Sequence, residues 1–312
     1  MDKELGHTNK VFVSLQDLLY QEHHAQDFSF LAKKQKVRSI LGGKHASKLR
    51  GRGLDFEEVR NYVAGDDIRT IDWKVTARTQ KTHTRVYSEE KEKPALIFVD
   101  QSTSMFFGSQ EKMKSVVAAE LAALAAFKIL KDGDRIGGVV YSDNGIDIVY
   151  PKRNRKNILH FFEKIVIRNN ELATAKATDH QKSSSIAFQK VRNIVTHDFL
   201  VIIISDFRRY DPTVIKNIAQ LAQKNDVILA KVTDPFERNI AQDTFVFGDG
   251  DKQLIVKGSN KKIQKNFSSG FDQGIRKFET EMKRHKIPVI SFNTITPISD
   301  QLKDILNPTK KI

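Results

Sequence analysis

The sequence predicts an α/β fold with a doubly wound, mostly parallel sheet that carries helices on both faces. A helical or irregular N-terminal extension precedes it. From residue 95 onward, apolar segments alternate with helical ones, and the strand-like segments at residues 95–99 and 199–205 are apolar along their length. Strands of this kind are typical of parallel sheets that are buried on both faces. Hydrophobic residues make up 39% of the 312-residue chain, which allows the large core that this fold needs.

The first 94 residues form the predicted extension. Residues 11–41 follow a loosely helical pattern, glycines punctuate residues 42–53, and residues 82–87 are strand-like. Between Lys33 and Arg52 lie eight basic residues and no acidic one. We interpret this segment as a solvated helix face and loop. Binding to nucleic acid or to an anionic surface is the alternative, although the segment has none of the aromatic residues that usually accompany such binding.

Residues 95–308 form the predicted α/β domain. We expect strands at residues 95–99, 135–141, 146–150, 199–205, 226–232 and 289–292, and a small β excursion at 244–256. The expected helices span residues 110–131, 154–168, 184–195, 261–285 and 298–305, and one more begins at Asp211 with a proline in its first turn. Ser109 is the expected cap of the helix at 110–131. Ligands of such folds bind at the carboxyl ends of the strands.

Composition narrows the range of functions. The net charge of +14 favours anionic partners, and the absence of cysteine rules out disulfides and thiolate chemistry. No apolar run is long enough to cross a bilayer, and the polar first ten residues do not resemble a signal peptide. We therefore expect a soluble, cytoplasmic protein without a transmembrane segment.

A set of oxygen-bearing side chains follows two of the predicted strands. The strand at 95–99 leads into Asp100, Ser102 and Ser104, and the strand at 199–205 leads into Asp206. Parallel strands bring both aspartates to one edge of the sheet, where their charges repel unless a cation joins them. Mg²⁺ prefers such oxygen ligands, and Mn²⁺ and Ca²⁺ suit the same set. The sequence thus predicts a divalent-cation site; the alternative is that Asp100 and Ser102 form a side-chain turn and Asp206 caps a loop.

Several motifs across most of the chain resemble one known family. They are Phe56–Tyr62, Gly65–Trp73, Ala77–Arg78, Asp100–Met105, Gly133–Gly137, Ser205–Phe207 and Asp234–Glu237. The chain resembles the bacterial family called "domain of unknown function 58", whose core is von Willebrand factor A-like. The block at residues 65–73 is the most specific of these motifs, whereas the motif that begins at Asp100 is shared by a far wider group.

The resemblance implies a metal-ion-dependent adhesion site. Asp100, Ser102 and Ser104 match its first motif, and Asp206 matches its late aspartate. In the wider group the serines bind the metal directly, the aspartates act largely through water, and a carboxylate of the partner protein completes the site. Ser184 best matches the second-loop ligand, although no glycine precedes it and Thr178 competes for the role. The implied partner is a MoxR-type AAA+ ATPase, acting with this chain in chaperone-like assembly or maturation.

The block at residues 65–73 surrounds the chain's one tryptophan with charge. One interpretation makes it a partner-binding surface formed by Asp66, Asp67, Arg69, Asp72 and Trp73. The other makes it a compact turn that Asp–Arg pairs hold together, with Trp73 anchored in a core and Arg60 and Arg78 as further members.

Catalysis is not expected. No P-loop, dinucleotide fingerprint or nucleophile elbow is present in the sequence. A metal-assisted phosphohydrolase that uses the same edge of the sheet is the enzymatic alternative. It would have to use Asp100, because no other convincing nucleophile or general base lies near the predicted site.

Overall fold

The computed structural model describes residues 10–26, 54–89, 93–175, 180–208, 210–238, 244–248, 253–257 and 261–306. The basic segment from Lys33 to Arg52 and Thr178 lie outside these residues. The chain divides into two compact units, one of residues 1–41 with 93–312 and the other of residues 42–92. This division differs from the expected boundary after residue 94, because the N-terminal helix belongs to the larger unit.

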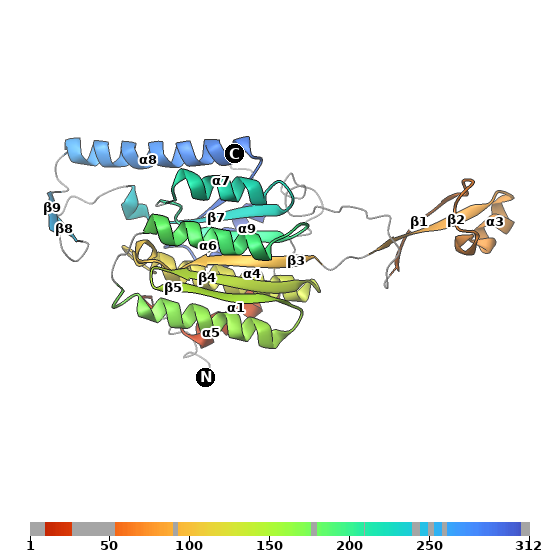
Figure 1. The fold of residues 1–312 in the computed structure, drawn as a ribbon, viewed down its shortest axis with the longest axis horizontal. Helices are drawn as coiled ribbons and strands as arrows, with labels where there is room; N and C mark the ends of the chain where they lie inside the picture. The colour runs from red at the N-terminus through yellow and green to blue at the C-terminus, as the bar shows by residue number, and fades with distance from the viewer. Residues whose placement is uncertain are drawn as a thin grey trace. The chain divides into compact units, whose positions relative to one another are not determined.

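A six-stranded sheet forms the centre of the larger unit (Figure 1). The strand order is β10-β7-β6-β3-β4-β5, and all neighbours are parallel except β5, which is antiparallel to β4. The predicted mostly parallel, doubly wound sheet is confirmed. Its strands are β3 (Pro94–Asp100), β4 (Arg135–Ser142), β5 (Gly145–Lys152), β6 (Leu200–Ser205), β7 (Asp226–Thr233) and β10 (Val289–Asn293).

Both faces of this sheet are covered by helices, because alternate residues of a strand point to opposite sides. Ala95, Ile97 and Val99 of β3 pack into one core, and Leu96 and Phe98 into the other. The first core is completed by α1 (Leu15–Gln26), α4 (Lys114–Lys131), α5 (Arg155–Glu171) and α9 (Ile298–Leu306). The second is completed by α6 (His180–Ile194), α7 (Pro212–Leu221) and α8 (Lys261–Arg284).

Helix α4 is the most deeply buried helix whose side chains are described, since every residue from 114 to 129 is buried. Its alanine-rich sequence lets β3 and α1 approach closely, and α1 makes many of its tertiary contacts with α4. The helix begins at Lys114 and not near residue 110, so the predicted cap was wrong: the cap residue is Met113. Ser109 instead bonds to Asp234, far along the chain.

Other predicted elements are confirmed with small shifts. Asn154 caps α5, and Asp211 caps α7 with a proline in its first turn. The β excursion is an antiparallel pair, β8 (Thr244–Gly248) and β9 (Gln253–Lys257). None of the described helices is long and apolar enough to cross a membrane.

The smaller unit is built on an antiparallel pair, β1 (Leu54–Asn61) and β2 (His83–Glu89). Between them lie the short 3-10 helix η1 (Ile68–Thr70) and helix α3 (Trp73–Thr79). The sequence indicated β2 but not β1. A bulge between Phe56 and Glu58 interrupts the alternation by which a strand is recognised.

Candidate functional site

Four neighbouring parallel strands each bring an aspartate to the carboxyl edge of the sheet, which is the edge formed by the C-terminal ends of the parallel strands. Asp143 follows β4, Asp100 ends β3, Asp206 follows β6 and Asp234 follows β7. All four are buried, with exposed fractions of 9%, 0%, 3% and 1%. The sequence analysis singled out Asp100 and Asp206. Asp143 carries the same signal, an aspartate directly after a strand, and was missed, whereas Asp234 was named only within a family motif and not as a site residue.

Asp100 is held at the centre of this edge by two hydrogen bonds. Its Oδ1 accepts the backbone N–H of Ser102 at 3.0 Å, and its Oδ2 accepts the Ser205 hydroxyl at 2.6 Å. The first bond tightens the loop that follows β3, and the second ties β3 to the end of β6. Asp100 therefore fixes the loop geometry, as the turn interpretation of the sequence also expected.

The loop after β3 presents two hydroxyl groups side by side. Ser102 and Ser104 flank the start of the 3-10 helix η2 (Thr103–Met105), and their Oγ atoms are 3.1 Å apart. Two adjacent ligands of an octahedral Mg²⁺ ion are separated by about 3.0 Å, because each bond is about 2.1 Å long. The Thr103 hydroxyl in the same turn is buried and has no hydrogen-bond partner in the described part of the chain. These hydroxyl oxygens are suitable ligands for a divalent cation.

Ser184 lies fully buried in α6. The hydroxyl of the preceding Ser183 is 2.7 Å from the hydroxyl of Tyr141, and Tyr141 is the register partner of Asp100 in the sheet. The fold thus brings this part of α6 close to β4 and to β3, the strand that leads into the loop with Ser102 and Ser104.

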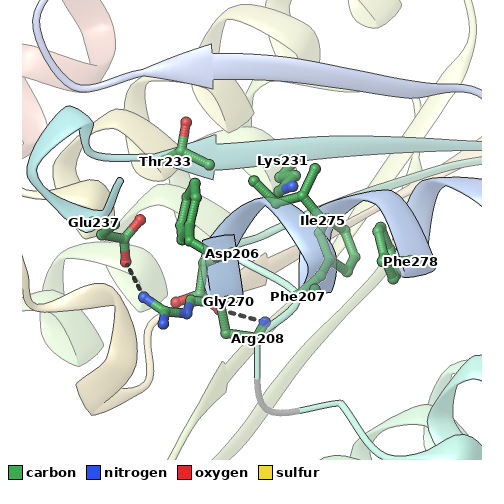
Figure 2. A pocket seen from close by; sticks show the side chains of 11 residues that line it. Asp206, Phe207, Arg208, Lys231, Thr233, Glu237, Gly270, Ile275 and Phe278 are labelled. Carbon is green, nitrogen blue, oxygen red and sulfur yellow. Dashed lines mark hydrogen bonds and ion pairs between the residues drawn. The ribbon is translucent and has the colours of Figure 1, made fainter. Parts of the chain in front are cut away.

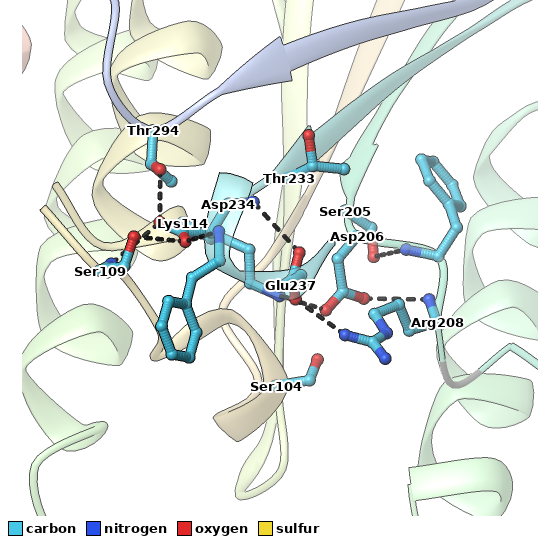
Figure 3. A network of polar contacts seen from close by, with 12 residues as sticks. Ser104, Ser109, Lys114, Ser205, Asp206, Arg208, Thr233, Asp234, Glu237 and Thr294 are labelled. Carbon is cyan, nitrogen blue, oxygen red and sulfur yellow. Dashed lines mark hydrogen bonds and ion pairs between the residues drawn. The ribbon is translucent and has the colours of Figure 1, made fainter. Parts of the chain in front are cut away.

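Asp206 is paired with a buried lysine that the sequence analysis did not single out. Lys114, at the start of α4, donates to Asp206 Oδ2 and to Glu237 Oε1, each at 2.7 Å (Figure 3). Arg208 adds a 3.1 Å bond to Glu237, and its backbone N–H donates to Asp206 Oδ1 at 3.1 Å. We call these four residues the Lys114 network. Burial opposes the charged form of Lys114, but the two carboxylates outweigh it and raise its pKa above the ordinary value.

The Lys114 network changes the charge balance that the sequence suggested. The carboxylates of Asp100 and Asp206 repel each other unless a positive charge lies nearby. The Lys114 ammonium is such a charge, and it belongs to the chain itself. A carboxylate oxygen can accept more than one hydrogen bond, so Asp206 keeps capacity for a water molecule. The groups that fit direct contact with a cation are therefore Ser102 and Ser104. In the described part of the chain, no three acidic or histidine side chains cluster as metal ligands.

Asp234 has a structural part at the same edge. It accepts hydrogen bonds from the Ser109 N–H and hydroxyl at 2.9 and 2.6 Å and from the Thr294 hydroxyl at 2.6 Å (Figure 3). With Glu237 it also forms a capping box on the 3-10 helix η3 (Pro235–Glu237). Asp234 thereby joins the loop before α4 to the ends of β7 and β10.

In the smaller unit, the block at residues 65–73 is organised by Asp–Arg pairs, as one interpretation predicted. Asp66 binds the Arg60 guanidinium through both oxygens, at 2.7 and 2.8 Å. Asp72 caps α3 and pairs with Arg85 at 2.8 Å. The expected anchoring of Trp73 in a core was wrong, because its side chain is 69% exposed.

The remaining members of the block lie at its surface. Asp67 caps η1 by accepting the Arg69 backbone N–H at 3.0 Å, and both residues are exposed. Ile68, between them, is 67% exposed. The block therefore combines an ordered backbone with exposed charged and apolar side chains.

Comparison with known proteins identifies the family. The family described as "Protein of unknown function DUF58" matches residues 58–274, more than two thirds of the chain. The chain belongs to this family. The mycobacterial proteins Mb1516 of Mycobacterium bovis and Rv1480 of Mycobacterium tuberculosis, both described as uncharacterized, are 28% identical over 206 residues. That match covers 66% of this chain and 63% of each relative, so the chain spans less than two thirds of their length.

Among solved structures, those that the chain matches include BatB from Bacteroides thetaiotaomicron and the SpRpn10 VWA domain. BatB is 14% identical, with a TM-score of 0.41 over 68% of this chain and 94% of BatB. The SpRpn10 domain is 12% identical, with a TM-score of 0.38 over 69% of this chain and 95% of the domain. The strand order of the DUF58 chain, with one antiparallel edge strand, agrees with the expected α/β fold with a mostly parallel sheet.

Proposed function

We propose that this DUF58 protein is a metal-dependent protein-interaction module and not an enzyme. Its site takes a carboxylate of a partner protein at the carboxyl edge of the sheet. The observation that carries the proposal is the pair of hydroxyls on Ser102 and Ser104, 3.1 Å apart in a loop that buried Asp100 holds in place. Ligands of doubly wound folds bind at this edge.

Each residue has a separate part in this proposal. Ser102 and Ser104 hold the cation, Mg²⁺ first and Mn²⁺ or Ca²⁺ as substitutes, and Ser184 is the second-loop candidate. Asp100 orients the loop through the Ser102 N–H, and Asp206 offers water-mediated contact from the end of β6. The cation supplies positive charge for a partner carboxylate. The hydrogen bonds on both oxygens of Asp100 also favour a supporting part over that of a nucleophile.

The proposed partner is a MoxR-type AAA+ ATPase in the cytoplasm, with the pair acting in assembly or maturation of other proteins. This step rests on the family resemblance. The exposed side chains of Trp73, Asp67 and Arg69 form a second candidate contact surface in the smaller unit. Aromatic and arginine side chains are enriched among residues that dominate binding energies at protein interfaces.

Calorimetric titration with Mg²⁺ and Mn²⁺ tests the site. We expect saturable binding by the wild type and a loss of affinity of about tenfold or more in Ser104→Ala, the order of loss seen when groups around a metal are removed. Ser291→Ala, which removes an exposed hydroxyl in β10, is the matched control and should bind as the wild type does. If Ser104→Ala bound the cation as tightly as the wild type does, the loop after β3 would not be part of the cation site.

The same variants test the partner. Binding to a purified MoxR-type ATPase should require Mg²⁺, disappear with a chelator and weaken in Ser104→Ala. Binding that survives both changes contradicts the metal-bridged contact. Mg²⁺-dependent hydrolysis of p-nitrophenyl phosphate, lost in Ser104→Ala, would point to the phosphohydrolase alternative. Nucleic-acid binding that is steeply salt-dependent and indifferent to Mg²⁺ would point to the basic segment from Lys33 to Arg52.

A further inference from the structure

A cavity of about 240 Å³ lies beside the Lys114 network, between α8 and the ends of β6 and β7 (Figure 2). Asp206, Arg208 and Glu237 of that network line one side of it. Drug-sized ligands and cofactors occupy pockets of about 300–1,000 Å³. The cavity is therefore the right size for a small molecule or a single residue of a peptide.

One side of the cavity is apolar. Phe207, Ile275 and Phe278 line it, and the rings of Phe207 and Phe278 stack with centroids 4.9 Å apart. The Arg208 guanidinium lies over the ring of Phe271 at 5.5 Å, which places a cation at the border of the apolar surface. A ligand that fits these walls has an apolar body.

Two glycines keep the helical wall of the cavity open. Gly270 and Gly274 lie one turn apart in α8 and both line the cavity, and a Cβ atom at either position would meet nothing within 4 Å. Glycine is unfavourable inside a helix, and neither position needs it for packing. Because Gly274 lines the cavity, a larger side chain there would take up space at the cavity wall.

A lysine that is almost fully buried also lines the cavity. Lys231 of β7 is only 4% exposed, and its ammonium forms no hydrogen bond or ion pair with any residue that the structure describes. Burial lowers the pKa of Lys231; Glu279, Glu237 and Asp206 oppose this shift from a distance, and Arg208 adds to it. A lysine side chain so largely withdrawn from water is costly unless an anion pairs with its ammonium. No carboxylate of the described residues lies within ion-pair distance of Lys231, although Glu279, Glu237 and Asp206 act on it from farther away.

We propose that this cavity binds a carboxylate that carries an apolar body, either a small free acid or the C-terminal residue of a peptide. The carboxylate pairs with Lys231, and the body packs between Phe207, Ile275 and Phe278. A monocarboxylate matches the single positive charge of Lys231. A phosphate dianion would bring a second charge toward Asp206 and Glu237 on the same wall. This site shares Asp206 with the proposed cation site, but its ligand contacts are Lys231 and the apolar wall and not the hydroxyl pair of Ser102 and Ser104.

Phenylacetate is the probe for the free acid, and 2-phenylethanol is its neutral counterpart. A tripeptide that ends in phenylalanine and its C-terminal amide probe the peptide source. Calorimetry or ligand-observed NMR should detect binding of at least one acid and at least tenfold weaker binding of its neutral counterpart. Preference for the peptide acid assigns the ligand to a chain terminus, and preference for phenylacetate assigns it to a free acid. Failure of both acids to bind overturns the proposal.

Three variants locate the binding. Lys231→Met keeps the length of the side chain but removes the charge, and Gly274→Leu fills the cavity; each should weaken acid binding at least tenfold. Lys283→Met, at an exposed position of α8, is the matched control and should bind normally. Ser104→Ala should also bind the acids normally. A result against the cavity proposal can therefore be distinguished from a result against the cation site. Unchanged binding by Lys231→Met overturns the proposal.

A measurement of thermal unfolding without ligand distinguishes a binding lysine from a structural one. Without ligand, Lys231→Met should unfold at the same or a higher temperature than the wild type, because the variant buries no unpaired charge. Phenylacetate should raise the unfolding temperature of the wild type and leave that of the variant unchanged. A marked loss of stability in Lys231→Met would show that the lysine serves the fold, and would contradict its assignment to a ligand.

Discussion

Lys114, which the sequence analysis did not name, links two buried carboxylates at the carboxyl edge of the sheet. Its ammonium joins Asp206 and Glu237 across 92 and 123 residues of chain, and its side chain is 1% exposed. A buried charge with two opposite partners contributes little net stability compared with an apolar side chain, but removing one member leaves the others uncompensated. The stability of the network is therefore sensitive to loss of the Lys114 ammonium.

Lys114→Met should lower the free energy of unfolding by about 3–5 kcal/mol, because Asp206 and Glu237 would lose their buried counter-charge. Urea unfolding followed by circular dichroism measures this change. Lys10→Met, which breaks an exposed pair with Glu111, is the control and should change stability little. A similar small change for both variants would mean that the buried network relaxes without its lysine.

Asp234 should make stability depend on pH in the acid range. Burial raises its pKa, but hydrogen bonds from Ser109, Thr294 and the Phe236 N–H outweigh burial and hold the pKa below the ordinary value. The stabilisation is thus complete above the ordinary aspartate pKa of about 3.9 and is lost as pH falls through the lower folded-state value. As the pH is lowered, the unfolding temperature of Asp234→Asn should fall less steeply than that of the wild type. Parallel pH profiles would contradict this.

At the scale of elements, close packing between β4 and α5 depends on a glycine. A Cβ atom at Gly138 would lie 2.0 Å from the ring of Phe161, which is itself buried. Neither residue can move easily, because α5 lies against the sheet at this point. The strand thus accepts a residue of low β propensity to let the helix approach.

Gly138→Ala should destabilise the protein by about 1–3 kcal/mol, the usual cost of overpacking a core. Gly270→Ala in α8 is a matched control, because its added methyl group meets nothing within 4 Å. There alanine should raise stability by up to about 1 kcal/mol through its helix propensity. Chemical denaturation of both variants measures the difference, and a loss of stability in Gly270→Ala would show that α8 packs more closely than the structure indicates.

At the scale of the whole molecule, the described residues of the two compact units differ in how much apolar surface they bury. Among residues 58–86 of the smaller unit, only Asp72 and Thr84 are buried, and no apolar side chain is. The larger unit has two apolar cores, one on each face of its sheet. Units with little buried apolar surface open at low free energy.

Hydrogen exchange should therefore be faster in β1 and β2 than in β3 and β6. Leu18→Ala, which leaves a cavity where α1 packs on α4, should lower the stability of the larger unit by about 2–5 kcal/mol. It should speed exchange in β3 and β6 and leave β1 and β2 unchanged. Mass spectrometry of peptides from the four strands checks both expectations. Equal acceleration in all four strands would show that the units unfold together.

Much of the fold was predictable from local pattern. The apolar strands at residues 95–99 and 199–205, and the aspartates that follow them, indicated a parallel sheet and the edge at which ligands bind. The proline after Asp211 marked the start of α7. These features depend on residues close together in the sequence, where periodicity and capping express the backbone conformation directly.

Tertiary structure alone decided which distant side chains meet at that edge. The pairing of Ser109 with Asp234, the Lys114 network and the burial of Lys231 all depend on strand order and on how α4 and α8 pack. A lysine at the start of a helix carries no sign of whether it faces water or two buried carboxylates. By itself the sequence determined the fold class and the aspartates at the strand ends; long-range packing decided how their charges are balanced, because electrostatic partners are set by distance in space.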